Sequence, residues 1–138
     1  MDDLVRWLTA QLDADEEQAR AACEYASPEW HLDEEFGETV LWWPPEPHVA
    51  EKEREKGLPV VSDRWRGETV GARIAPHIAA HDPARVLREI DAKRQMIDRY
   101  EEVRPHGGDV TQEYQDFLLR LLASVYADRP GYREEWRP

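Results

Sequence analysis

The chain has 138 residues with 30 acids against 18 bases, so its formal net charge is −12. This length suits one domain, and the single cysteine excludes a disulfide scaffold. No apolar run approaches the ~20 residues of a membrane span, the start Met1-Asp2-Asp3 lacks the basic region of a signal peptide, and the net charge opposes direct nucleic-acid binding.

The first predicted element is a helix over residues 2–26. Asp2 or Asp3 can cap its start. Its apolar face repeats every four residues, at Leu4, Leu8 and Leu12. An acidic run over 13–17 predicts a kink or a break, because aspartate is a poor interior helix residue.

Residues 30–43 predict a β-hairpin, since they are rich in tryptophan, leucine and valine. Neither side of its second strand is polar, so this strand is either covered on both faces or exposes a binding surface. A mobile, charge-rich loop is expected over about 44–58. Short strands follow within 59–73, the better candidate being 59–65 and the weaker one 68–73.

Two further helices are predicted. The first begins after Asp82 as N-cap, with Pro83 at its first position, and continues to about Val103. The second covers 109–126, where Asp109 and Gln112 have the spacing of a capping box. Its apolar stripe is expected to face the core and consists of Tyr114, Phe117, Leu118, Leu121, Leu122 and Val125.

The C-terminal residues predict one helical turn docked on the body, through Tyr132 and Trp136. The elements together predict an α+β fold in a single domain over residues 1–138, with three main helices packed on a small antiparallel sheet.

Three segments carry a family resemblance: MDDLVRWL from Met1, HIAAHDPARVLREIDAKR from His77, and LLASVYADRPGYREEWRP from Leu121. They resemble the domain-of-unknown-function family numbered 6221, which occurs in actinobacteria and their phages. The match covers about half the chain and leaves out 36–73. The family pattern has histidine where this chain has Arg129. The resemblance implies lineage and a cytoplasmic location, and it brings no activity with it.

His77 and His81 lie four residues apart, a spacing that places two imidazoles on one helix face and suits a metal ion. A metal-dependent hydrolase using this pair is therefore one alternative function. The structural interpretation is a pair of histidines packed or hydrogen-bonded at a helix junction, with Asp82 occupied as a helix cap. No residue is assigned a catalytic or cofactor-binding role, and no cofactor is expected.

The negative charge is concentrated in residues 1–38, which hold twelve acids and two bases. A solvated surface is the simplest interpretation, and a surface for a basic partner is the alternative. Bases on the helix over 83–103 give another alternative, a basic groove that docks the acidic first helix or a partner. The expected partner-binding residues are Asp13, Asp15, Glu16, Glu17, Asp33, Glu34, Glu35 and Trp42.

The favoured function is a non-enzymatic, cytoplasmic module whose acidic N-terminal third engages a protein with a basic surface. One specific form is a phage or mobile-element decoy of a nucleic-acid-handling protein. A homodimeric structural module is the third alternative, and the oligomeric state stays open.

Overall fold

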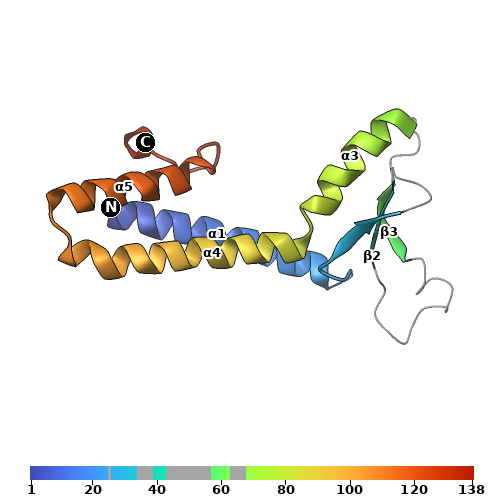
Figure 1. The fold of residues 1–138 in the computed structure, drawn as a ribbon, viewed down its shortest axis with the longest axis horizontal. Coiled ribbons are helices and arrows are strands. Elements are labelled where there is room, and N and C mark those ends of the chain that lie inside the picture. The colour runs from blue at the N-terminus through green and yellow to red at the C-terminus, as the bar shows by residue number, and fades with distance from the viewer. Residues whose placement is uncertain (25, 34–38, 43–56, 63–67) are drawn as a thin grey trace. The chain divides into compact units, whose positions relative to one another are not determined.

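The computed structural model describes residues 1–24, 26–33, 39–42, 57–62 and 68–138 (Figure 1). They form two compact units, one made of Met1–Glu16 with Glu89–Pro138 and one made of Glu17–Arg88. We call them the terminal unit and the central unit. Helices α1 (Asp2–Cys23) and α4 (Pro83–Val103) each contribute residues to both units.

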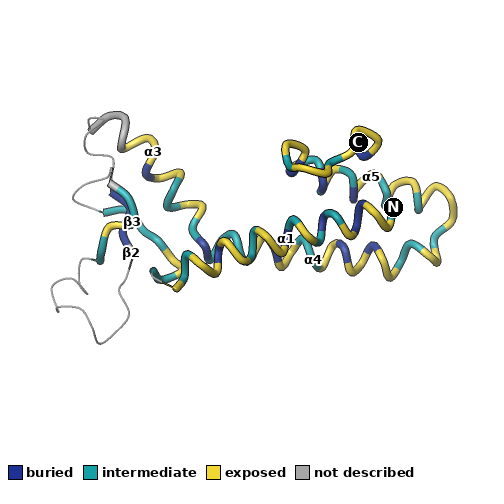
Figure 2. The backbone as a smooth tube through the Cα atoms, turned by 180° about the vertical axis from the view of Figure 1, so that it is seen from behind, coloured by how far each residue is buried: buried dark blue, intermediate teal, exposed yellow. Residues whose placement is uncertain are grey.

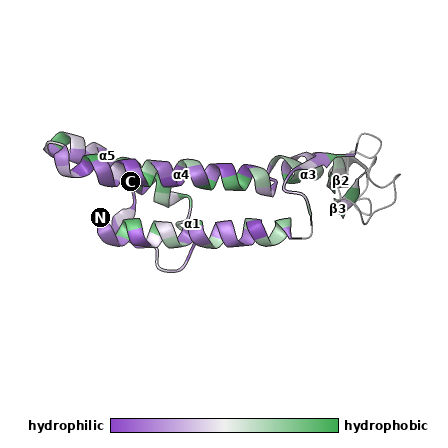
Figure 3. Cartoon of the chain, turned by 90° about the horizontal axis from the view of Figure 1, so that it is seen from below, coloured by the Kyte–Doolittle hydropathy of each residue, from purple (hydrophilic) through white to green (hydrophobic). Residues whose placement is uncertain are grey.

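The terminal unit is helical. It contains most of α1 and α4, the 3₁₀ turn η2 (Arg104–His106), helix α5 (Asp109–Ser124) and the 3₁₀ turn η3 (Glu134–Trp136). Within this unit α1, α4 and α5 run alongside one another (Figures 1, 2 and 3). Its core is formed by Leu4, Val5, Leu8, Leu12, Ile90, Ile97, Tyr100, Leu119, Ala123, Tyr126 and Trp136.

Helix α1 confirms the predicted leucine stripe, because Leu4, Leu8 and Leu12 are all fully buried. The prediction over 13–17 offered a kink or a break, and the break is wrong, since the helix is continuous to Cys23. Neither Asp2 nor Asp3 is the N-cap, because both lie in the first turn. At that position a carboxylate still interacts favourably with the positive end of the helix dipole.

The C-terminal turn is docked as predicted. Trp136 is only 6% exposed, and its ring lies 5.4 Å from that of Trp7 and 5.9 Å from that of Tyr132. The Trp7 indole also donates a hydrogen bond to the carbonyl oxygen of Pro130, at 3.1 Å. These aromatic contacts fasten the C-terminal segment to the start of α1.

Helix α5 corrects the predicted core stripe. Leu119 and Ala123 are its buried residues, while five of the six expected core residues are exposed and Leu122 is half-buried. The predicted stripe lies on the side of the helix away from Leu119, and α5 is apolar on both sides. Periodicity alone could not show which apolar side the other helices cover.

The predicted capping box of α5 is also wrong. Gly108 is the N-cap, and no side chain bonds to the helix start. The Gln112 amide instead donates to two carbonyl oxygens of the preceding turn, those of Gly107 at 2.8 Å and Arg104 at 3.1 Å. Gln112 therefore closes the connection between α4 and α5 rather than capping the helix.

The central unit contains an antiparallel sheet in the order β1 (Trp30–Leu32), β2 (Thr39–Trp42), β3 (Leu58–Ser62). Pro59 lies in an edge strand, where the missing backbone N–H is tolerated. Thr39, Val40 and Leu41 are all buried, so β2 is covered on both faces at these three positions. The sequence had left open whether this strand is covered on both faces or exposes a binding surface. Most of the loop expected over 44–58 lies outside the described residues, and its last residue, Leu58, begins β3.

The strand predicted over 68–73 is wrong, because helix α3 (Glu68–Ala80) begins there and packs against the sheet. Because this segment was assigned to a strand, the sequence predicted three main helices, whereas the described chain has four. The start of α4 is as predicted, since the Asp82 carboxylate accepts a hydrogen bond from the backbone N–H of Arg85 at 2.7 Å. Its other oxygen accepts from the N–H of Trp30 at 3.2 Å.

The helices and the sheet make an α+β fold, as predicted. Among the described residues, no helix is both long enough and apolar enough to cross a membrane.

Candidate protein-binding surface

One side of α5 is an exposed apolar surface in the terminal unit. Its side chains are between 37% and 82% exposed, although all are large and apolar. We call this surface the α5 face, and it consists of Val110, Tyr114, Phe117, Leu118, Leu121 and Val125. Exposed apolar residues are usually scattered singly, and a contiguous set indicates an interaction site.

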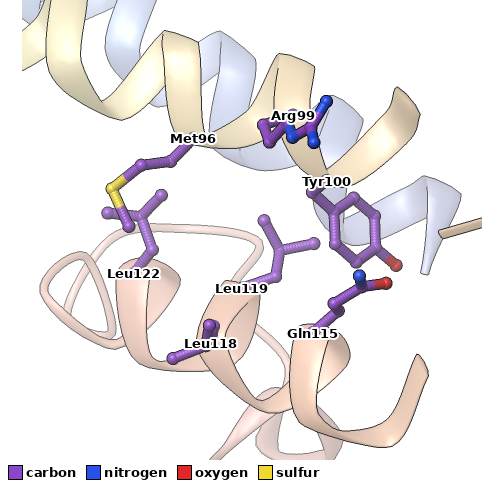
Figure 4. A pocket seen from close by; sticks show the side chains of 7 residues that line it. All are labelled: Met96, Arg99, Tyr100, Gln115, Leu118, Leu119 and Leu122. Atoms are coloured by element: carbon purple, nitrogen blue, oxygen red, sulfur yellow. The ribbon is translucent and has the colours of Figure 1, made fainter. Parts of the chain in front are cut away.

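The α5 face continues into an apolar groove of about 210 Å³ between α4 and α5. Figure 4 shows Met96 on α4 opposite Leu122 on α5, with Leu119 at the base. Leu118 belongs both to the groove and to the α5 face. Met96 is 53% exposed, and methionine adapts its shape easily to an apolar partner.

A polar cluster includes Tyr100, one of the residues that line this groove. The Tyr100 hydroxyl donates to the Asp116 carboxylate at 2.7 Å, and Arg104 Nε donates to the same oxygen at 3.1 Å. Burial, followed by the neighbouring Asp116 carboxylate, raises the pKa of the Tyr100 hydroxyl well above its usual range. The hydrogen bond to Asp116 also raises the pKa of Arg104. The cluster thus fixes the positions of α4 and α5 beside the groove.

We expect Tyr100→Phe to lower the free energy of unfolding by about 1–2 kcal/mol, because Asp116 loses one donor. The raised pKa means that the folded protein retains the hydroxyl proton after the unfolded chain has lost it. This contribution is present below about pH 10, the ordinary tyrosine pKa, and is lost as the pH rises above it. Urea unfolding of the unmodified protein and of Tyr100→Phe should therefore show a smaller difference in unfolding free energy above pH 10 than at pH 8. A constant difference would contradict this assignment.

Three of the acids expected to bind a partner form ion pairs within the terminal unit. Arg94 binds Asp13 at 2.6 Å and Glu16 at 2.5 Å, and Arg129 binds Asp15 at 2.5 Å. Two hydrogen-bonded carboxylates raise the pKa of Arg94. Arg94, which lies on α4, therefore binds acidic residues of α1. This contact corresponds to one alternative left open by the sequence, in which bases of the helix over 83–103 dock the acidic first helix.

Arg129 also contacts an aromatic ring and the backbone of α1. Its guanidinium lies 4.6 Å from the centre of the Tyr126 ring and donates a long hydrogen bond of 3.4 Å to the Gln11 carbonyl oxygen. Together with Asp15, these contacts give Arg129 a structural role in joining the C-terminal segment to α1.

The remaining expected partner-binding residues belong to different segments of the chain. Glu17 is exposed on α1, and Asp33 is half-buried after β1. Glu34 and Glu35 lie outside the described residues, and Trp42 is placed only as the last residue of β2.

Removing Arg94 tests whether its ion pairs hold the helices together. We expect Arg94→Met to lower the free energy of unfolding by about 1 kcal/mol at low salt and by less at high salt, because these partly exposed charges are screened. Arg137→Met is the control, since Arg137 and Glu134 are both mostly exposed, and it should have little effect. Urea unfolding at two salt concentrations measures both variants. Equal losses in the two would show that Arg94 has no special role.

His77 and His81 lie together at the end of α3, in the central unit. Their rings are 4.2 Å apart, and Nδ1 of His81 lies 2.7 Å from the carbonyl oxygen of His77. Within the described ranges, no three or more histidine, cysteine or acidic residues are arranged to hold a metal ion. The geometry matches the structural interpretation of a histidine pair at a helix junction.

Comparison with known proteins identifies the family of this chain. A model of a family of unknown function, DUF6221, matches residues 1–138. The chain belongs to this family. DUF6221 therefore covers the middle segment that the resemblance left out, as well as both ends and the central helix. No curated protein and no solved structure matches the chain.

The sequence singled out all residues of the α5 face in this DUF6221 protein except Val110, but assigned them to the core. One signal could have shown their exposure. Leu119, Leu122 and Ala123 form a second apolar set on α5. When a helix is apolar on two sides and packs against its own chain through only one of them, the other side stays exposed.

Proposed function

We propose that this protein is a non-enzymatic interaction module that binds another protein chain through the α5 face. The observation that carries the proposal is the contiguous exposure of six large apolar side chains on one side of α5. Burial of such surface is the main favourable term in most protein association, and a methionine-lined groove beside it adds adaptable contact area.

Site-specific photo-crosslinking in the source cells tests this proposal. A photoreactive phenylalanine analogue replaces Phe117, which lies on the α5 face, and as a control replaces Glu101, an exposed residue of α4. We expect a covalent adduct with a protein chain from position 117 and little from position 101. Equal yields at both positions, or no adduct at position 117, would contradict the proposal.

We propose as the alternative that acids of the N-terminal third engage a partner with a basic surface, with a phage decoy as one form. Glu17 favours this proposal, because it is exposed and forms no ion pair with another described residue. In this case Glu17→Gln should weaken capture of a basic partner, and raising the salt concentration should weaken capture by the unmodified protein. Capture that is insensitive to both changes would exclude this alternative.

A further inference from the structure

Four residues of the α5 face have a symmetric spacing along the helix. Val110, Tyr114, Phe117 and Leu121 are separated by four, three and four residues, which is the heptad spacing of helices that pack side by side. The row is therefore symmetric about the midpoint between residues 115 and 116. A contact between two identical chains related by a two-fold axis requires this kind of self-complementary surface.

We propose that the partner of the α5 face is a second copy of this chain, bound with its α5 helix antiparallel. This inference rests on the proposed function and names its partner. In an antiparallel pair centred on the midpoint, Tyr114 of each copy faces Phe117 of the other. Val110 likewise faces Leu121, so that the row becomes a continuous apolar seam.

Charge favours the antiparallel arrangement. Glu113 and Arg120 are two helical turns apart and lie on the same flank of the row. Neither forms an ion pair with another residue that the structure describes, and Nε of Arg120 is buried without a hydrogen-bond partner there. Antiparallel packing brings Glu113 of each copy beside Arg120 of the other, because equivalent flanks of the two helices meet.

A parallel pair lacks this complementarity. There, Glu113 of one copy would flank Leu118 of the other, and Arg120 would flank Val125, so that both charges face apolar side chains. The other flank of the antiparallel pair carries no charge in either copy and includes Leu118 and Val125. Leu118 lies there beside the groove that contains Met96, and the seam therefore extends onto α4.

The first experiment measures the mass of the unmodified protein by sedimentation equilibrium over a range of concentrations. We expect a reversible dimer. Leu121→Glu should raise its dissociation constant by at least about 100-fold, because the two-fold axis places two carboxylates in the apolar seam. Ile74→Glu is the matched control, since Ile74 is similarly exposed but lies on α3, and it should leave the dimer unchanged.

Folding of each variant is checked by circular dichroism, and Val110→Glu replaces Leu121→Glu if the latter does not fold. Val110 is 82% exposed, so this change leaves the core of the single chain intact. A protein that stays monomeric at every concentration would overturn the proposal. A dimer that neither seam variant weakens would also overturn it.

Charge reversal tests the antiparallel pairing itself. Glu113→Arg and Arg120→Glu should each weaken self-association. In either variant, residues 113 and 120 have the same charge, and they meet between the two copies of the dimer. Mixing the two variants should restore a dimer of one copy of each, since one ion pair re-forms as in the unmodified protein and the other re-forms with its signs exchanged. Failure of the mixture to associate would exclude this arrangement.

The two proposals fail in different ways. A position-117 adduct with twice the mass of the chain supports both of them. An adduct with a different protein, from a chain that stays monomeric, leaves the α5 face as a binding surface and removes the second copy as its partner.

Discussion

Replacing Trp136 with alanine is expected to lower the free energy of unfolding by about 3–5 kcal/mol, the cost of removing a buried tryptophan side chain. Trp136 packs against the rings of Trp7 and Tyr132, and the Arg133 guanidinium lies 5.1 Å from the centre of its ring. Alanine removes all of these contacts and leaves a cavity beside α1. Urea unfolding followed by circular dichroism measures the loss.

Glu135→Ala is the control for this change. Glu135 is adjacent to Trp136 in the same turn but is exposed, so its removal should cost less than about 0.5 kcal/mol. Both variants are compared with the unmodified protein at one protein concentration, because self-association would add to the apparent stability. A loss below about 1 kcal/mol for Trp136→Ala would mean that the docked turn contributes little to folding.

Replacing Gly131 with alanine is expected to lower the free energy of unfolding by about 2–4 kcal/mol, although only one methyl group is added. The φ angle of Gly131 is +86°, where a side chain is strained. A Cβ atom there would lie 2.9 Å from Nε1 of Trp7. The indole cannot move without breaking its hydrogen bond to Pro130.

Gly108→Ala is the matched control, because Gly108 has an ordinary φ of −73° and a Cβ atom there meets no other atom within 4 Å. Its loss should stay below about 1 kcal/mol, the difference between glycine and alanine as a helix N-cap. Equal unfolding midpoints for the two variants would show that Trp7 moves freely, and that the close approach of Gly131 does not hold the segment.

Elements that carry local signals were predicted correctly. Asp82 followed by Pro83 has the chemistry of a helix start, and the structure places the start of α4 there. The leucines of α1 are spaced for one covered side, and that side is buried. The spacing of Tyr132 and Trp136 likewise predicted a docked turn, because two large aromatic residues four positions apart share one side of a helical turn.

The errors arose where tertiary contacts outweigh local preference. The strand predicted over 68–73 was the weaker candidate, since Gly71 disfavours a central strand, and this segment is helical where α3 packs on the sheet. For α5, the apolar pattern identified a helix but not which side of it is covered, which depends on the position of α1 and α4. All residues of the candidate binding surface except Val110 were therefore named from the sequence but assigned to the core.

Acidic residues in the first helix illustrate the same limit. Asp13, Asp15 and Glu16 form a conspicuous negative cluster in the sequence, but their arginine partners are about 80 and 114 positions away along the chain. The charge of a segment therefore overstates the charge that it presents to a partner.

The aromatic contact between Trp7 and Trp136 also determines when the protein can fold during synthesis. The central unit is one uninterrupted stretch of chain, whereas the terminal unit joins its first sixteen residues to its last fifty. While a ribosome is still translating α5, the start of α1 lacks its aromatic partners and exposes apolar surface. Chaperones that bind nascent chains would therefore meet the N-terminal helix of this protein before it can pack.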